Sequence, residues 1–216
     1  MLSVPEKLFL LSLYEKRNGS IQTNKSSLLP YGLIAGGLIQ LILSGEGTIN
    51  SSRKFIILNP ATGYLSIPAD LIHHILYEKD FRKCTFWIET LGRKRKKIEE
   101  VFLNHFVDSK ILVLEGQVYR FSTEKDSTGK FNEKEEIRRQ ILGRGAISSE
   151  TLAVVKLMNA VHLLDHLFTC DEIKPMHFQI DNLKNSVPQE EIVKQVDADI
   201  LGIVDSLNQI IGNEKE

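Results

Sequence analysis

Apolar positions recur at helical spacing over most of the chain, which predicts a mainly helical protein. The first predicted helix opens with the capping pattern of Ser3 and Glu6 around Pro5. It includes Tyr14 and ends at the turn Asn18–Gly19. The N-terminal segment is therefore expected to be one helix followed by a polar connection.

The segment Leu28–Leu43 is apolar on every side and contains several glycines, so a second, buried helix is predicted there. Each glycine costs about 1 kcal/mol of helix propensity relative to alanine. We expect tight packing to offset this cost, because the small residues Ala35, Gly36 and Gly37 allow another helix to approach closely.

The remaining pattern predicts short hairpins between further helices. The expected hairpins are Thr48–Ile49 with Phe55–Leu58, and Leu112–Phe121 around Gly116. The expected helices are Pro68–Tyr77, Lys83–Leu91, one beginning at Arg93–Lys97, Asn132–Leu142, Ser149–Phe168 and Pro188–Ile211. The polar residues 122–130 are expected to form a mobile loop. The predicted fold class is mainly α: a single compact helical domain, residues 1–216, with short peripheral β-hairpins.

Composition narrows the class of protein. The 216 residues are 42% hydrophobic and 25% charged, which are ordinary globular values and exclude disordered and fibrous classes. A net charge of −1 and a pI near 6.6 do not suit a dedicated nucleic-acid-binding protein. The two cysteines, Cys84 and Cys170, are far apart, so neither a disulfide framework nor a zinc site is predicted.

The chain shows no secretory signal and no membrane span. Residues 1–7 lack a basic region followed by a long apolar run. The longest uncharged apolar stretch, Leu33–Leu43, is shorter than the ~20 residues that a spanning helix needs. We therefore expect a cytosolic protein that can lie on a membrane surface.

The run Arg93–Lys97 is the clearest local chemical feature. Five consecutive cations at a helix start oppose the helix dipole, which favours negative charge there. Three interpretations stay open: a solvated basic face, an anionic membrane surface, or nucleic acid. Each cation near an anionic bilayer contributes about 1 kcal/mol. The run alone therefore gives weak, reversible binding, and a second contact is needed, such as the apolar hairpin residues Val118 and Tyr119.

No constellation for catalysis is apparent. His162 and His166 are spaced one helical turn apart, but the glutamate that follows the first histidine in zinc hydrolases is missing. No nucleophile elbow, phosphate-binding loop or Cys–His arrangement occurs. The protein is therefore expected not to be an enzyme and to need no cofactor or metal. Trp87 is expected in the core.

Three segments, in order, carry a family resemblance: Tyr31–Gly45, Trp87–Leu91 and Phe106–Leu112. Their order and distances resemble the Golgi phosphoprotein 3 family of peripheral membrane proteins, over nearly the whole chain. The resemblance implies an almost all-α domain with hairpins at its rim. It also implies binding of phosphatidylinositol 4-phosphate in a shallow basic pocket, client membrane proteins such as Golgi glycosylation enzymes, and location at the Golgi in a eukaryote.

The positions of this sequence that match the residues of the family's pocket are only partly basic. Its tryptophan falls in residues 20–26, which hold no aromatic side chain, and its first arginine corresponds to Ile34. Its two later basic positions fall near Lys96 and Glu99. Binding is therefore expected to follow total negative charge and not one inositide. The candidate phospholipid-binding residues are Lys25, Arg93, Lys94, Arg95, Lys96 and Lys97.

The family hairpin that corresponds to residues 112–121 takes part in self-association, so a homo-oligomer through this hairpin is expected. Its alternating Val113, Val118, Tyr119 and Phe121 cannot all be buried on one side. The alternative reading is a protein–protein interaction module without a lipid role. Nucleic acid is not expected as a partner.

Overall fold

The computed structural model describes residues 2–58, 81–122, 126–143, 147–183 and 191–213, and it confirms a mainly α fold with short two-stranded hairpins. The helices are α1 Val4–Ser12, α2 Leu29–Leu43, α4 Cys84–Gly92, α5 Arg95–Asp108, α6 Asp126–Leu142, α7 Ser149–Ala160, α8 Leu164–Leu167, α9 Cys170–Leu183 and α10 Glu191–Asn213. The strands are β1 Leu13–Glu15, β2 Ile21–Thr23, β3 Gly47–Ile49, β4 Phe55–Ile57, β5 Leu112–Glu115 and β6 Val118–Phe121.

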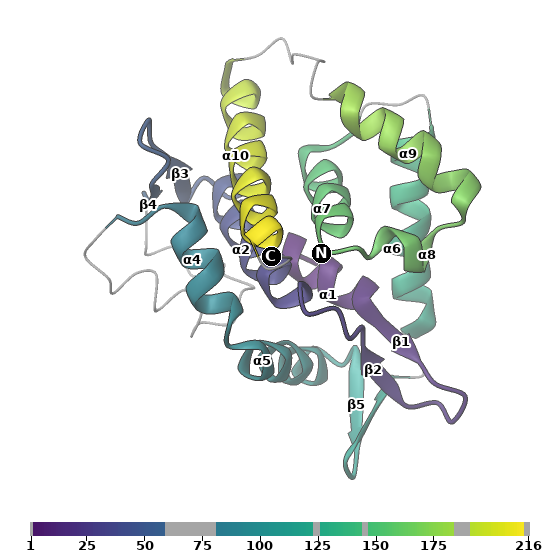
Figure 1. Ribbon diagram of the computed structural model, residues 1–216. Coiled ribbons are helices and arrows are strands. Elements are labelled where there is room, and N and C mark those ends of the chain that lie inside the picture. Colours follow the sequence, from purple (N-terminus) through teal and green to yellow (C-terminus); the bar gives the residue numbers. More distant parts are fainter. Residues whose placement is uncertain (1, 59–80, 123–125, 144–146, 184–190, 214–216) are drawn as a thin grey trace.

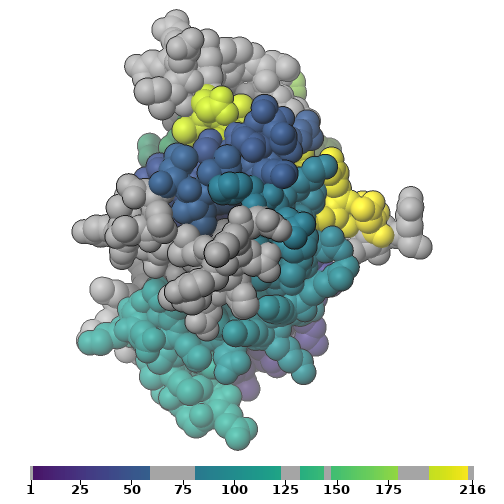
Figure 2. Space-filling view, turned by 90° about the vertical axis from the view of Figure 1, so that its left-hand side faces the viewer, coloured from purple at the N-terminus to yellow at the C-terminus, as the bar shows by residue number. Residues whose placement is uncertain are grey.

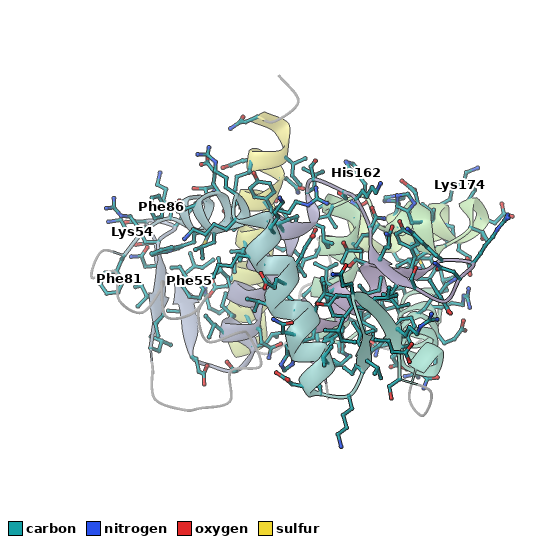
Figure 3. The ribbon with its side chains drawn as sticks, turned by 90° about the horizontal axis from the view of Figure 1, so that it is seen from below. Lys54, Phe55, Phe81, Phe86, His162 and Lys174 are labelled. Carbon is teal, nitrogen blue, oxygen red and sulfur yellow. The ribbon has the colours of Figure 1, made fainter. Side chains whose placement is uncertain are left out.

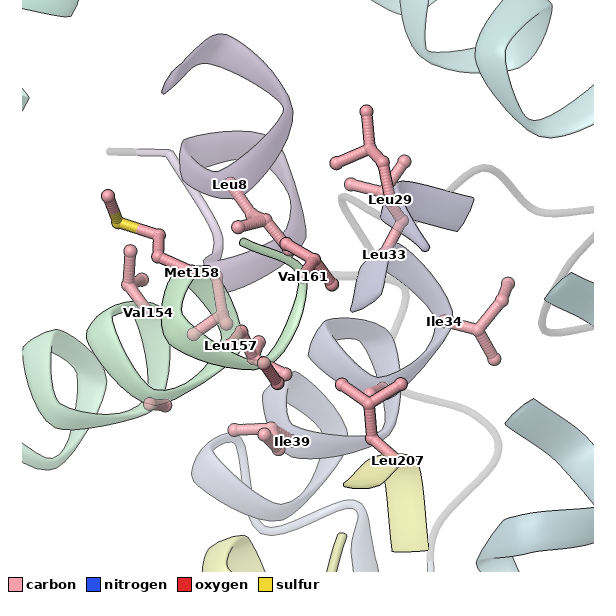
Figure 4. Close-up of a cluster of buried hydrophobic side chains, with 14 of the residues drawn as sticks. Leu8, Leu29, Leu33, Ile34, Ile39, Val154, Leu157, Met158, Val161 and Leu207 are labelled. Atoms are coloured by element: carbon pink, nitrogen blue, oxygen red, sulfur yellow. The ribbon is translucent and has the colours of Figure 1, made fainter. Parts of the chain in front are cut away.

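Helix α2 lies in the middle of the molecule (Figure 1). Every residue of α2 except Gln40 and Leu43 is buried, as expected for a helix that is apolar on all sides. Helices α1, α4, α7 and α10 pack around it. Figure 4 shows side chains of α1, α2, α7 and α10 meeting in one cluster. The hydrophobic core of the protein is therefore built on α2.

Two glycines of α2 permit this close packing. An alanine Cβ at Gly32 would lie 2.6 Å from Val161 Cγ1, and one at Gly36 would lie 3.3 Å from the Pro5 Cα. The expected close approach is thus confirmed at Gly36, with α1 as the partner. At Gly32, which was not among the predicted positions, the partner is the end of α7.

Helix α5 is fixed to α1 by aromatic and polar contacts. The Phe9 ring lies 5.0 Å from Phe102 and 5.4 Å from Phe106, measured between centroids. The buried carboxylate of Glu6 accepts hydrogen bonds from the Ser3 N–H and hydroxyl, both at 2.6 Å, and lies 2.5 Å from His105 Nε2. One glutamate therefore both caps α1 and holds α5.

All three hairpins are antiparallel. Two buried or half-buried side chains tie them to other elements. The Asp199 carboxylate of α10 accepts from the Thr48 hydroxyl and the Ile49 N–H of β3, both at 3.2 Å. Arg120 of β6 donates to the Asn18 carbonyl in the β1–β2 turn at 3.1 Å. The hairpins that the sequence predicted at 48–58 and 112–121 are confirmed.

The prediction of a helix up to Asn18 is wrong. Helix α1 ends at Ser12, Leu13 is extended, and Tyr14 lies in β1. Gly19 adopts φ +77°, and the chain reverses there so that Leu13 pairs with Thr23. Asn18–Gly19 is thus a hairpin turn, because a left-handed glycine can reverse an extended chain as readily as it can end a helix.

Other boundaries also differ from the predictions. The expected helix 149–168 is interrupted between α7 and α8, where His162 adopts φ +58°. Residues 126–130, expected in a loop, belong to α6, and α9 was not predicted, since Pro175 interrupts its pattern. The helix expected at 68–77 lies outside the described residues. Within the described part, none of the helices is both long and apolar enough to cross a bilayer.

Gly32→Ala is expected to lower the free energy of unfolding by up to about 2 kcal/mol. The new methyl group overlaps the stiff Val161 side chain, at a cost of ~1–3 kcal/mol, and regains only ~1 kcal/mol of helix propensity. Gly212→Ala is the matched control, since no atom lies within 4 Å of a Cβ there. Urea denaturation of both variants measures the difference. Equal stability of the two variants would contradict the packing argument.

Candidate functional site

The run Arg93–Lys97, here called the basic junction, spans the connection of two helices. Gly92 is the last residue of α4, Arg93 its C-cap and Lys94 the N-cap of α5. The Lys94 N–H donates to the Leu91 carbonyl at 2.9 Å, and the Ile98 N–H donates to the Lys94 carbonyl at 3.1 Å. The helices therefore join almost without a loop, and Figure 1 shows the end of α4 meeting the start of α5 at one corner of the molecule.

Gly92 anchors this corner to the core. A Cβ at Gly92 would lie 2.3 Å from the Tyr31 ring, so the buried ring rests directly on the glycine backbone. Tyr31 belongs to the first turn of α2. The basic junction is thus positioned by the central helix.

The five cations have different surroundings. Arg93 pairs with Glu89, and Arg95 Nε lies 3.0 Å from Glu99 Oε1, so the two arginines are partly neutralised within their own helices. Lys94, Lys96 and Lys97 are exposed. Within the described part of the chain, Lys94 and Lys96 carry no ion pair. Lys94 and Lys96 are therefore the cations best placed to meet an external anion.

The start of α5 also lacks a side-chain cap. Lys94 at the N-cap cannot accept a hydrogen bond, and no side chain caps the first N–H groups there. No acidic residue stands in the first turn to balance the positive end of the helix dipole. The helix start without a side-chain cap and the exposed Lys94 and Lys96 together favour an anion at this position.

Lys25, predicted as part of the same site, is exposed on the connection between β2 and α2. Its neighbour Ser26 donates to the Val161 carbonyl at 3.2 Å, which ties the segment to the end of α7. Among the described residues, no hydrogen bond or ion pair joins Lys25 to the basic junction. Its part in an anion site therefore stays a prediction.

Two of the three positions carried over to the inositide pocket, Ile34 and Glu99, are not basic. Ile34 is 3% exposed and packs in the core (Figure 4). Glu99 is engaged by Arg95. Of the carried-over basic positions, only Lys96 presents a free cationic side chain in the described structure.

The β5–β6 hairpin presents apolar side chains to solvent. Val113, Leu114 and Val118 are 42%, 47% and 37% exposed. Tyr119 and Phe121 are half-buried, which confirms that the alternating residues are not all buried. Leu112 at the base is buried. The hairpin therefore has a fixed base and an apolar tip.

The remaining candidates are not assembled as sites. His162 is exposed in the break between α7 and α8, and His166 is exposed within α8. Among the described residues, no three metal-ligating side chains come together. A hollow of about 510 Å³ is lined by consecutive residues of the β1–β2 turn, 14–18. These features give no support for catalysis.

A second group of cations was missed from the sequence. Arg53 and Lys54 of one hairpin lie beside Arg82 and Lys83, which precede α4. In the sequence these are only two separate Arg–Lys pairs, and their proximity depends on the pairing of distant backbone segments. The weak signal that was available is that an aromatic residue adjoins each pair.

Cys84, in the first turn of α4, is buried beneath this group. Burial raises the pKa of its thiol to about 12, and the negative charge of Asp199 acts in the same direction. The thiol therefore stays neutral at physiological pH, and Cys84 is not a nucleophile. Trp87, one turn further along α4, is buried, as expected.

Comparison with known proteins identifies a family. The model of the Golgi phosphoprotein 3 (GPP34) family matches residues 4–200. That family suggests a Golgi-associated, non-enzymatic role in trafficking. No curated protein matches the chain significantly.

The two cysteines are expected to differ in reactivity. Near pH 8, iodoacetamide should alkylate the exposed Cys170 and leave Cys84 unmodified, because the thiolate is the reactive form. Mass spectrometry of intact protein should show one adduct natively and two after unfolding. Cys170→Ser should show none natively. A native adduct on Cys84 would mean that the start of α4 opens readily.

Proposed function

The chain belongs to the Golgi phosphoprotein 3 family, and we propose that it binds anionic phospholipid head groups at a membrane surface through the basic junction. The observation that carries the proposal is the start of α5, where an uncapped helix end and exposed lysines coincide. Head-group phosphates would meet both the free N–H groups and the cations. The role in trafficking would then be that of an adaptor that links a membrane to client membrane proteins.

The binding through this junction is weak. Each unpaired lysine near an anionic bilayer contributes about 1 kcal/mol. Since Arg93 and Arg95 are already paired, the junction supplies less than the full run of five cations would. Stable residence at the membrane therefore needs a second contact.

The head-group preference follows from the same geometry. A pocket for one inositide needs several directed donors around a phosphate. Here Ile34 is in the core and Glu99 is acidic. We propose that the membrane's total negative charge governs binding, with phosphoinositides as one source of that charge.

A protein–protein contact through the β5–β6 hairpin is the second candidate function. The exposed Val113, Leu114 and Val118 favour it, since an apolar tip on a rigid base suits contact with another protein. The partner proposed is a second copy of the chain. Self-association would also place two basic junctions on one membrane and strengthen their binding.

Lys94→Glu with Lys96→Glu should lower binding to vesicles of phosphatidylcholine and phosphatidylserine by more than tenfold, because two attractive charges become repulsive. The matched control is Lys16→Glu with Lys174→Glu, an equal charge change at exposed residues elsewhere. Co-sedimentation measures the bound fraction. Raising salt to ~1 M, where the Debye length is about 3 Å, should release the parent protein.

Two results would oppose this proposal. Equal sedimentation of the Lys94/Lys96 variant and its control would exclude the basic junction as the binding surface. A strong preference for phosphatidylinositol 4-phosphate over phosphatidylserine at matched charge would overturn only the proposed lack of head-group specificity.

Replacing Val113, Leu114 and Val118 by serine should lower the mass of any oligomer in light scattering. The helical circular dichroism should stay unchanged, because these side chains are exposed while Leu112 and Arg120 keep the hairpin in place. Leu142→Ser, at an exposed leucine of α6, is the control. An unchanged oligomer mass would exclude the hairpin as the interface.

A further inference from the structure

The second group of cations forms, with two exposed phenylalanines, a surface that we call the α4 patch: Arg53, Lys54, Phe81, Arg82, Lys83 and Phe86. Lys54 and Lys83 pair across an antiparallel bridge, and the Phe55 N–H donates to the Arg82 carbonyl at 2.9 Å. Figure 2 shows the β3–β4 hairpin and α4 side by side on one face of the molecule. Main-chain pairing thus holds the patch together.

The two phenylalanines of the α4 patch differ in exposure and in their neighbours. Phe81 is 56% exposed, and it lies at the edge of the molecule in Figure 3. Phe86 is 36% exposed and rests edge-on against the buried Trp87, at 5.1 Å between ring centroids. The Arg82 guanidinium lies over the Phe86 ring at 5.2 Å. Phe86 is therefore supported by the core through Trp87, and Phe81 is the more exposed aromatic residue of the patch.

The six residues of the patch include four cations, Arg53, Lys54, Arg82 and Lys83. Of the acidic residues next to it in the chain, Glu89 pairs with Arg93, on the side of the basic junction. The nearby Asp199 is buried and already accepts hydrogen bonds from β3 and from Gln195. Exposed aromatic rings beside cations fit the boundary between anionic head groups and acyl chains.

The backbone conformation of Arg53 also favours a functional role for the α4 patch. It adopts φ +57° in the β3–β4 turn, in the left-handed region that favours glycine. Its N–H donates to the Asn50 carbonyl at 2.9 Å, which fixes that conformation. An arginine is therefore held where a glycine would be less strained, and it adds a fourth cation to the patch.

We propose that the α4 patch is a second membrane contact, in which the cations meet lipid phosphates and Phe81 and Phe86 enter the head-group layer of an anionic bilayer. This inference rests on the proposed function and supplies the apolar contact that the basic junction lacks. Helix α4 joins the two surfaces, and its nine residues span roughly 14 Å at about 1.5 Å each. Both surfaces can then touch one bilayer, so that each raises the effective concentration of the other.

Nucleic acid fits the patch less well. Base stacking needs open ring faces on successive aromatic side chains. Arg82 already covers Phe86, which leaves Phe81 alone, and the chain has a net charge of −1. Contact with a bilayer does not need open ring faces on successive aromatic side chains.

The test compares Lys54→Ser with Phe81→Ser against a control of the same composition, Lys174→Ser with Phe178→Ser. Phe178 is 66% exposed, and Lys174 lies at the opposite end of the molecule from Lys54 (Figure 3). Binding to phosphatidylcholine–phosphatidylserine vesicles should fall at least tenfold in the patch variant, with about fivefold from the lysine. The control should bind as the parent does.

Two further measurements separate binding from folding. Arg53→Gly removes a cation and relieves the left-handed residue, so its unfolding temperature should equal or exceed that of the parent while vesicle binding falls about fivefold. Trp87 is the single tryptophan and lies against Phe86. Lipids with brominated acyl chains should therefore quench its emission in the parent, and less in the patch variant.

The outcomes distinguish the two proposals. If the parent does not sediment with anionic vesicles, the proposed function fails. If the parent binds and the Lys94/Lys96 variant does not, but the patch variant binds like its control, only the α4 patch is excluded. If the patch variant keeps vesicle binding and loses binding to a single-stranded oligonucleotide that the parent binds, the patch is a nucleic-acid surface.

Discussion

The burial of α2, whose residues are all buried except Gln40 and Leu43, is the constraint on which the rest of the structure depends. A helix that is apolar on every side must be surrounded, and here α1, α4, α7, α10 and β3 pack around it. Gly32 and Gly36 let α1 and the end of α7 approach it closely, and Gly92 lets α4 rest on Tyr31. The glycines therefore lower the helix propensity of α2 and α4, but they allow close contacts that hold the surrounding elements in place.

The basic junction follows from this arrangement. Tyr31 at the start of α2 fixes the end of α4, while Phe9 and Glu6 of α1 fix α5. The connection between α4 and α5 is consequently short and carries its cations at a corner. A lysine at the N-cap is locally unfavourable, since serine or aspartate would stabilise the helix start. A residue type that does not suit its local structural position is common at functional sites.

Both proposed membrane surfaces depend on α4. The junction at one end offers lysines and free N–H groups, and the patch at the other end offers cations with exposed aromatic rings. Charge attracts the protein from a distance and is screened by salt, whereas apolar contact acts at short range and is not. A peripheral protein that combines them binds reversibly and stays on the membrane longer than either contact allows alone.

The sequence by itself determined the mainly α class, the glycine-rich core helix, the hairpins at 48–58 and 112–121, and the basic run at 93–97. These features are local, because periodicity and turn residues encode them within a few positions. Only the tertiary structure decided that residues 13–23 form a hairpin and that the helix after Ser149 breaks at His162. It also decided that Arg95, unlike Lys94, forms an ion pair within the part of the chain that the structure describes. It also brought Lys54 to Lys83. The pairing of distant segments depends on how whole elements pack around α2, and no local pattern records it.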